Sequence, residues 1–376
     1  MSAVAWILLA AAAAAFFLVQ LVYLSFVLAW EDRRTRGLAY YGLEPAARDR
    51  FKRTLRLHAT LLYPILSLLG RFSSFTFERS SFTHAEVAGP KGTCSAESFA
   101  RAERYRPAAH DIFVVTQMKC GTTWMQHLVY EVLQRGAGDL VESGRALYAV
   151  SPWLEGLKSV PVEAAPLIGS ERPSRVIKTH LPTRLCPFGP TARYIYVARH
   201  PVSCFASCAD FLATNTGALG PDLAQLESWF CSEEMWWGPW PEHVAGWWQR
   251  ARQSENVLLV HFEEMKADLA GVARRVAAFL GMSTLTDDEI GAVVRKCSFD
   301  YMQRHRTTFE MHPPHILATH ADLFVRGTAD RHHDVPGDLR RRILTWCADA
   351  LEDSDYPLER MYGSVAAASR PALENR

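Results

Sequence analysis

The first feature of the chain is a long apolar stretch at its N-terminus. No charged residue occurs between Ala3 and Trp30, and about 20 apolar residues suffice for a helix to cross a bilayer. A cleaved signal peptide usually has a basic start and an apolar run of only about 7–15 residues. Here no Lys or Arg precedes the run, and the run is longer. We therefore expect residues 1–30 to form a retained transmembrane helix.

The charges that flank this stretch predict its orientation. Basic residues are absent before it and frequent after it, namely Arg33, Arg34, Arg36, Arg48, Arg50, Lys52, Arg53 and Arg56. Because Lys and Arg near a span stay cytoplasmic, we expect the N-terminus outside and the bulk of the chain in the cytoplasm. The basic segment could also hold anionic lipid, at about 1 kcal/mol per residue, or serve only as a topology signal.

A second apolar patch, Leu61–Leu69, is broken by Pro64 and is too short to span a bilayer. Three interpretations stay open: it lies on the membrane surface, it lines a hydrophobic entrance, or it is an ordinary packing helix.

From about residue 106 the pattern alternates between short apolar runs and helical periodicity. The expected strands are Ile112–Thr116, Arg175–Thr179, Tyr194–Ala198 and Val257–Val260, and the expected helices are Thr123–Leu133 and Leu269–Leu280. Strands that alternate with helices indicate an α/β fold with a mostly parallel sheet. We expect a basic juxtamembrane region over 31–105, a main domain over 106–362, and a disordered tail over 363–376.

Composition narrows the function further. The 376 residues are 49% apolar, 22% charged and 11% aromatic, with a net charge of +1. This excludes a wholly disordered chain and argues against a nucleic-acid partner, which usually requires a strong basic excess. The eight cysteines form no CxxC pair and no zinc-finger spacing with histidine. A reducing compartment is therefore the simpler interpretation.

The strongest chemical signal is the segment Gln117-Met118-Lys119-Cys120-Gly121-Thr122-Thr123-Trp124, between an expected strand and an expected helix. The first amides of a helix lack internal partners, and the helix dipole there favours anions. Gly121 lets the backbone close around a phosphate, Lys119 adds a positive charge, and two threonines add hydroxyl donors. It is not the nucleotide P-loop, because the Lys precedes the Gly and no earlier Gly is present.

A Lys-x-Gly-Thr-Thr-Trp loop after a strand instead resembles the 5′-phosphosulfate loop of the sulfotransferases, whose donor is 3′-phosphoadenosine 5′-phosphosulfate. The family loop usually reads Pro-Lys-Ser-Gly-Thr-Thr-Trp, so Met118 replaces the Pro and Cys120 replaces the Ser. The resemblance implies a P-loop-like three-layer fold. It also implies donor binding by Lys119, Cys120, Gly121, Thr122, Thr123 and Trp124, with Trp124 stacked on the adenine.

Further segments carry the same resemblance. Lys178-Thr179-His180-Leu181-Pro182 is similar to a family segment whose histidine is the general base, and a histidine titrates near neutral pH and can take a hydroxyl proton. Lys178 would lie beside the transferring group, or form an ion pair. Arg199, after an expected strand, and Ser207, eight residues later, match the pair that holds the donor's 3′-phosphate.

The resemblance is weaker towards the C-terminus. Phe262 replaces a family tyrosine that contacts the nucleotide, and Cys297 and Phe299 occupy the place of a Thr-Ser-Phe near the adenine. Arg326 and Gly327 resemble the last 3′-phosphate clamp, but its Lys, second Gly and Trp are missing. We expect the cover over the donor to differ here.

Together these segments predict a membrane-anchored sulfotransferase that acts on a hydroxyl of a small or lipid-like acceptor, without a metal. The alternatives are a nucleotide-dependent phosphotransferase and a non-catalytic membrane-anchored nucleotide-binding protein. A Golgi enzyme with a lumenal domain is the alternative location, although the charge pattern opposes it. The acceptor, the organelle and the oligomeric state, including a homodimer, are left open.

Overall fold

The computed structural model describes residues 2–72, 75–216, 220–311, 313–316 and 331–362. Its strands are β1 (Ser81–His84), β2 (Val87–Pro90), β3 (Asp111–Thr116), β4 (Arg175–Thr179), β5 (Arg193–Ala198) and β6 (Val257–His261). Its helices in the N-terminal part are α1 (Ala3–Arg34), α2 (Leu38–Tyr41), α3 (Pro45–Leu61), α4 (Tyr63–Phe72), α5 (Phe77–Ser80) and α6 (Ala96–Glu103). The later helices are α7 (Thr122–Leu133), α8 (Leu147–Val150), α9 (Pro201–Thr216), α10 (Leu223–Phe230), α11 (Trp240–Gln253), α12 (Phe262–Ala267), α13 (Leu269–Leu280), α14 (Asp287–Lys296), α15 (Phe299–Arg304), α16 (Gly337–Ala350) and α17 (Leu358–Tyr362).

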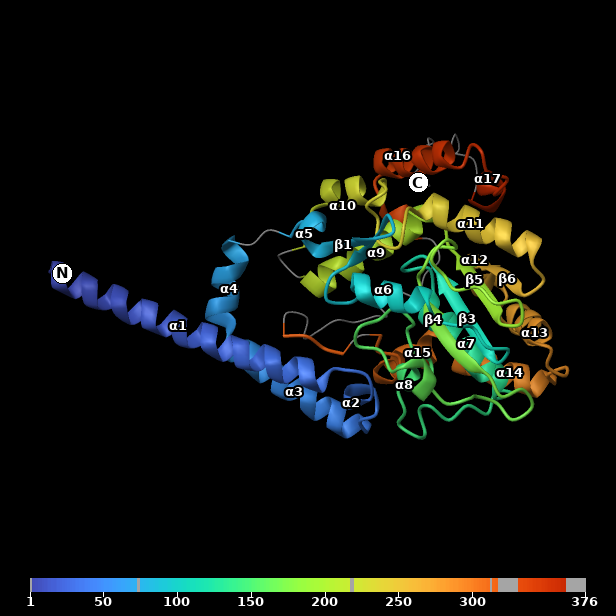
Figure 1. Cartoon of the computed structure of the whole chain (residues 1–376), viewed down its shortest axis with the longest axis horizontal. Coiled ribbons are helices and arrows are strands. Elements are labelled where there is room, and N and C mark those ends of the chain that lie inside the picture. The colour runs from blue at the N-terminus through green and yellow to red at the C-terminus, as the bar shows by residue number, and fades with distance from the viewer. Residues whose placement is uncertain (1, 73–74, 217–219, 312, 317–330, 363–376) are drawn as a thin grey trace, which may run out of the picture.

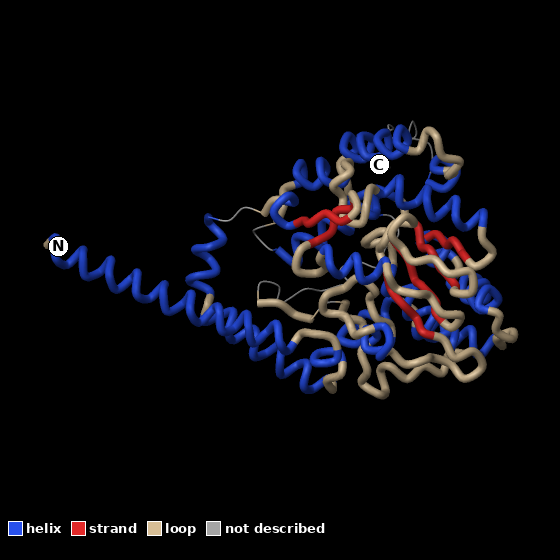
Figure 2. The backbone as a smooth tube through the Cα atoms, viewed as in Figure 1, coloured by secondary structure: helices blue, strands red, loops and turns tan. Residues whose placement is uncertain are grey.

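The main sheet is parallel and has the strand order β4-β3-β5-β6. Alternate residues of each strand enter different cores: Phe113 and Val115 belong to one, Ile112 and Val114 to the other. Helices cover both faces (Figures 1 and 2), with α11 and α16 contributing to the first core and α7 and α13 to the second. A parallel sheet buried on both faces explains why its strands are continuously apolar rather than alternating. The expected α/β fold with a mostly parallel sheet is confirmed.

The order of the strands fixes where a ligand can bind. The chain leaves β3, reaches β4 on one side of it, and then crosses to β5 on the other side. In open parallel sheets, ligands bind at the carboxyl ends of strands where the order reverses in this way. The loop after β3, His180 after β4, Arg199 after β5 and Phe262 after β6 all lie at that edge.

The N-terminal helices extend from this body (Figure 1). Helix α1 is long and apolar enough to cross a membrane, and its most apolar stretch has no buried residue. Its last turns pack antiparallel against α3: the Tyr23 hydroxyl lies 2.6 Å from His58 Nδ1, and the Trp30 and Phe51 rings stack 4.9 Å apart. The Leu61–Leu69 patch spans the end of α3 and most of α4.

Residues 31–105 are tied to the sheet domain by buried polar contacts. The Arg48 side chain is 1% exposed and donates to the carbonyls of Thr307, at 2.8 Å, and Gly144, at 3.0 Å. Tyr40 donates to Glu310 at 2.7 Å, and Lys52 pairs with the same carboxylate. Further along, Phe77 and Phe99 are members of the core on one face of the sheet. The segment before residue 106 therefore shares the cores of the domain that follows it.

Candidate active site

The loop between β3 and α7 has a backbone shape that only some residues adopt easily. Gly121 has φ +99° and Lys119 has φ +63°. A Cβ on Gly121 would lie 2.7 Å from the Phe262 ring, so the glycine is required for space as well as for its dihedral angle. The side-chain amide of Gln117 stabilises the loop by donating hydrogen bonds to the carbonyls of Trp236 and Gly238. The N-cap residue of α7 is Gly121, which has no side chain to cap the first amides of the helix, and this leaves them available to an anion.

The two threonines of the loop are held by neighbouring hydroxyls. Thr122 Oγ1 lies 2.7 Å from Thr116 Oγ1, and Thr123 Oγ1 lies 3.0 Å from the Tyr148 hydroxyl; both threonines line the cavity described below. Cys120 differs, because its thiol is buried, lies 3.8 Å from Cys204 Sγ, and is not among the cavity-lining residues. Only the backbone of Cys120 is therefore suited to bind a donor.

Lys119 lies where its charge can meet a phosphate. Its Nζ is 4.7 Å from the centre of the Phe211 ring, and its side chain lines the cavity. Burial lowers the pKa of Lys119 to about 8, and the nearby Arg199 acts in the same direction. An anion bound beside it would favour the charged form again.

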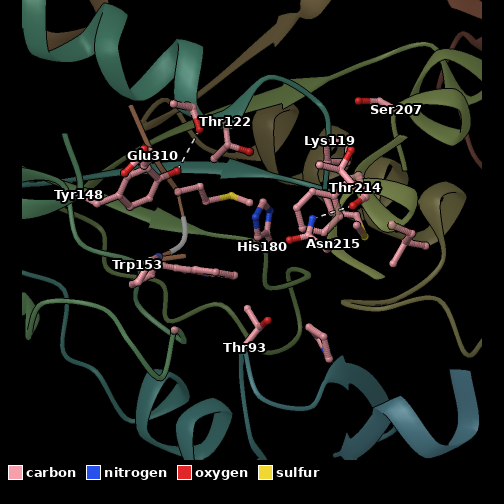
Figure 3. Close-up of a pocket in the computed structure, with 18 of the residues that line it drawn as sticks. Thr93, Lys119, Thr122, Tyr148, Trp153, His180, Ser207, Thr214, Asn215 and Glu310 are labelled. Carbon is pink, nitrogen blue, oxygen red and sulfur yellow. Dashed lines mark hydrogen bonds between the residues drawn. The ribbon is translucent and has the colours of Figure 1, made fainter. Parts of the chain in front are cut away.

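His180 follows β4 and is at the centre of the site (Figure 3). Its Nδ1 lies 2.9 Å from the Thr116 carbonyl oxygen, which can only accept a hydrogen bond. The proton of a neutral ring therefore belongs on Nδ1, and the lone pair on Nε2. The backbone amide of His180 donates to Glu155 at 2.7 Å, and the rings of Trp153 and Trp237 lie 5.4 and 4.8 Å from the imidazole. This packing fixes the plane of the ring.

Lys178 is one layer behind His180 rather than in the cavity wall. It is fully buried and absent from the lining residues, and its Nζ lies 3.6 Å from the centre of the Trp153 ring. No hydrogen-bond partner is present for this ammonium within the described residues. Burial lowers the pKa of Lys178, and the nearby Glu155 carboxylate opposes that shift. The structure thus brings a buried charge near the site, separated from it by an aromatic ring.

Arg199, which follows β5, connects the end of that strand to the loop after β3. Its Nη1 donates to the Lys119 carbonyl at 2.9 Å, and its guanidinium lies 4.3 Å from the centre of the Phe262 ring. Ser207, on α9, lines the same cavity. Arg331 is a further cation in this wall and pairs with Asp210 at 2.5 Å. Sequence reasoning missed Arg331, because only the fold brings it to α9.

An aromatic group forms the side of the site next to α12. The Trp124 and Phe262 rings meet edge to face at 5.4 Å, and Phe299 lines the cavity near them. Cys297 contributes its carbonyl, which accepts from Trp124 Nε1 at 2.7 Å, while its thiol is buried. Lys266 Nζ lies 5.5 Å from the Trp124 ring. Arg326 and Gly327 lie outside the described residues.

All these walls belong to one cavity of about 850 Å³. Besides the loop and His180, it is lined by the aromatic side chains of Tyr148, Trp153 and Trp237, and by Leu28, Glu31 and Asp32 at the end of α1. Sequence reasoning missed all six, since an isolated aromatic or acidic residue carries no motif. Within the described part of the chain, no group of three His, Cys, Asp or Glu side chains is placed to hold a metal ion.

The donor residues fit an anionic nucleotide. The uncapped start of α7 and the glycine cradle suit one phosphate. Arg199, which contacts the loop, and Arg331, which lines the same cavity, suit a second phosphate. The Nε atom of Arg199 has no hydrogen-bond partner within the described residues. A planar base has aromatic partners in Trp124 and Phe262.

Comparison with known proteins agrees with this chemistry. The family model described as "Sulfotransferase domain" matches residues 109–355. The 3-alpha-hydroxysteroid sulfotransferase of Cavia porcellus is 30% identical over 247 residues, which are 64% of this chain and 81% of the relative. Human sulfotransferase 2B1 is 28% identical over 254 residues, 65% of this chain and 67% of the relative.

Solved structures share the fold. Mouse sulfotransferase SULT7A1 complexed with PAP has a TM-score of 0.55 at 21% identity, covering 75% of this chain and 98% of its own. Retinol dehydratase in complex with androsterone and the inactive cofactor PAP has a TM-score of 0.57 at 20% identity, covering 72% and 91%. The extent of the family match decides the assignment. This chain belongs to the sulfotransferase family and is an enzyme whose sulfuryl donor is 3′-phosphoadenosine 5′-phosphosulfate.

Proposed function

We propose that the chain is a membrane-anchored sulfotransferase that transfers a sulfuryl group to the hydroxyl of a small or lipid-like acceptor, with His180 as the general base. The observation that carries this proposal is the position of His180. Its Nδ1 is committed to the Thr116 carbonyl, which leaves the lone pair on Nε2, and its ring shares one cavity with Lys119 and Gly121.

The chain's own groups then have distinct tasks. His180 Nε2 takes the acceptor proton as the acceptor oxygen forms its bond to sulfur. The bond between sulfur and the donor's phosphate oxygen breaks, and Lys119 and the first amides of α7 stabilise the negative charge that remains on that oxygen. Arg199 and Ser207 select the 3′-phosphate, Trp124 and Phe262 hold the base, and the buried Lys178 adds positive potential from behind Trp153.

The nature of the acceptor is supported by the cavity wall. Tyr148, Trp153 and Trp237 offer an apolar surface around His180, as a site for the carbon skeleton of an alcohol requires. Among the similar proteins are hydroxysteroid sulfotransferases and a retinol dehydratase solved with retinol. A steroid-like or retinoid-like alcohol is therefore the first class to test.

Replacing His180 tests its role as base. We expect His180→Ala to lower transfer to a hydroxysteroid by about 10²- to 10⁴-fold, while binding of 3′,5′-adenosine bisphosphate stays within about twofold. His84→Ala removes an imidazole that pairs with Glu103 away from the cavity, and serves as the matched control. Radiolabelled transfer and calorimetric titration are the measurements. Transfer by His180→Ala near the level of the control would remove His180 from the mechanism.

Replacing Arg199 tests selection of the 3′-phosphate. We expect Arg199→Ala to weaken binding of 3′,5′-adenosine bisphosphate by about 10- to 100-fold, the usual value of a charge-assisted hydrogen bond. Binding of 5′-AMP should weaken much less. Because Arg199 also holds the Lys119 carbonyl, the comparison between the two nucleotides is the decisive reading. Equal weakening would mean that Arg199 acts only by shaping the loop.

The lowered pKa of Lys119 predicts proton uptake. At pH 9, above a pKa of about 8, Lys119 of the free protein is mostly neutral, and a bound phosphate raises that pKa again. Binding of 3′,5′-adenosine bisphosphate at pH 9 should therefore take up about one proton more than binding by Lys119→Met. Titrations in two buffers of different ionisation enthalpy measure this. Equal uptake by the two proteins would contradict the assignment of Lys119 to the phosphate.

The basic residues after α1 support our proposal that the sulfotransferase domain faces the cytoplasm, and two glycosylation acceptors test this orientation. The sequence contains no Asn-x-Ser/Thr site, so each acceptor introduced is the only one. We expect an acceptor in an extension ahead of Met1 to be glycosylated in cells and the one created by Glu352→Asn, in an exposed turn, to remain unmodified. The reverse pattern on an electrophoretic gel would place the sulfotransferase domain in the lumen.

A further inference from the structure

Helix α4 leaves an apolar face uncovered beside α1. Leu62, which precedes α4, and Ile65 are buried, whereas Tyr63 and Leu69 of α4 are 69% and 42% exposed and Leu61, the last residue of α3, is 51% exposed. The helix contacts α1 and runs across it rather than along it (Figure 1). An apolar face of this kind, continuous with the exposed apolar surface of α1, needs a partner that is itself apolar.

The depth at which α4 meets α1 can be read from the neighbouring contacts. Phe17 is the first large side chain of α1 that is partly covered, while Val4 to Phe16 include only exposed large side chains. Further along, Tyr23 meets His58 and Trp30 meets Phe51, so α3 descends along α1 towards α4. Helix α4 therefore begins about level with the middle of α1.

The charges of α3 limit how deep the chain can enter a bilayer. Arg53 and Arg56 are exposed on α3, and charged side chains are costly within hydrocarbon. The span must therefore end before the level of Arg56, close to Tyr23. Residues 3–22 rise by about 30 Å as a helix, which equals the thickness of the hydrocarbon core. Tyr23 then lies at the headgroups, where an aromatic hydroxyl is favoured.

We propose that α4 lies in the plane of the membrane, on the domain side, with its Tyr63 and Leu69, and Leu61 at the end of α3, inserted among the lipids. Phe17, six residues before Tyr23, is about 9 Å below that residue, and interfacial helices bury their apolar face by about 5–10 Å. Arg53 and Arg56 then meet anionic headgroups. This seating rests on the proposed membrane anchoring by α1, and it moves the end of the span from Trp30 to about Tyr23.

The proposed position of α4 in the membrane also determines how far the cavity lies from the lipids. Leu28, which lines the cavity, is five residues beyond Tyr23 and thus about 8 Å further along α1. The rim of the active-site cavity is therefore held just above the headgroup layer. An amphipathic alcohol that resides in the bilayer has its hydroxyl in this layer and reaches the rim by moving about 8 Å outwards.

A fluorescence experiment on the full chain in vesicles with anionic lipid tests the seating. Seven of the eight native cysteines are buried, so a thiol-reactive, polarity-sensitive dye reports on an introduced cysteine, with the labelled unsubstituted chain as background. The variants are Leu69→Cys on α4, Leu9→Cys as a deep reference on α1, and Thr54→Cys as a control on the exposed side of α3. Each is first shown to bind 3′,5′-adenosine bisphosphate.

We expect the dye at Leu69→Cys to be quenched several-fold more by lipids brominated near the carbonyl than is the dye at Thr54→Cys. The dye at Leu9→Cys should instead be quenched most by lipids brominated near the chain end. If Leu69→Cys matches Thr54→Cys while Leu9→Cys is quenched, the seating of α4 is wrong and the anchor stands. If none is quenched, the membrane anchoring is wrong and the seating with it.

Discussion

The parallel alignment of four strands is the constraint on which the rest of this structure depends. Because β3, β4, β5 and β6 run in the same direction, their carboxyl ends meet at one edge of the sheet. A functional segment directly follows each of these four ends: the loop with Lys119 and Gly121 after β3, His180 after β4, Arg199 after β5 and Phe262 after β6. Residues that are more than a hundred positions apart in sequence thus share one cavity. The hydrogen bond from Arg199 to the Lys119 carbonyl and that between His180 and the Thr116 carbonyl join neighbouring strand ends.

Much of this arrangement could be predicted from the sequence, because the signals are local. The strand Arg175–Thr179 and the helix Leu269–Leu280 were predicted with the bounds observed, and the other three predicted strands differ by one residue at an end, whereas β1 and β2 were not predicted. A buried strand is an apolar run bounded by turns, and α13 ends at Gly281, whose φ of +71° suits a helix end. The site residues that directly follow strands were found for the same reason.

The remaining parts of the site depend on contacts that have no local signal. Trp153 and Trp237 flank His180 only because long loops return to the sheet edge. Lys178 precedes His180 by two residues, so the period of a strand would place both side chains on the same face of the sheet. The ammonium of Lys178 is nevertheless covered by the Trp153 ring. Cys120 and Cys297 offer backbone rather than thiol groups to the site. Likewise, the sequence of residues 31–105 contains no pattern that predicts the burial of Arg48 and Tyr40 against the segment 307–310.

The measurement that tests the central claim most directly is a comparison of two labelled donors with the full-length chain and one hydroxysteroid acceptor. The first donor is 3′-phosphoadenosine 5′-phosphosulfate with a radiolabelled sulfuryl group, and the second is ATP with a radiolabelled γ-phosphate. A cavity that combines a glycine cradle, a 3′-phosphate arginine and a histidine base predicts label transfer from the first donor alone. Transfer from ATP, or from neither donor while the protein is folded, would contradict the account.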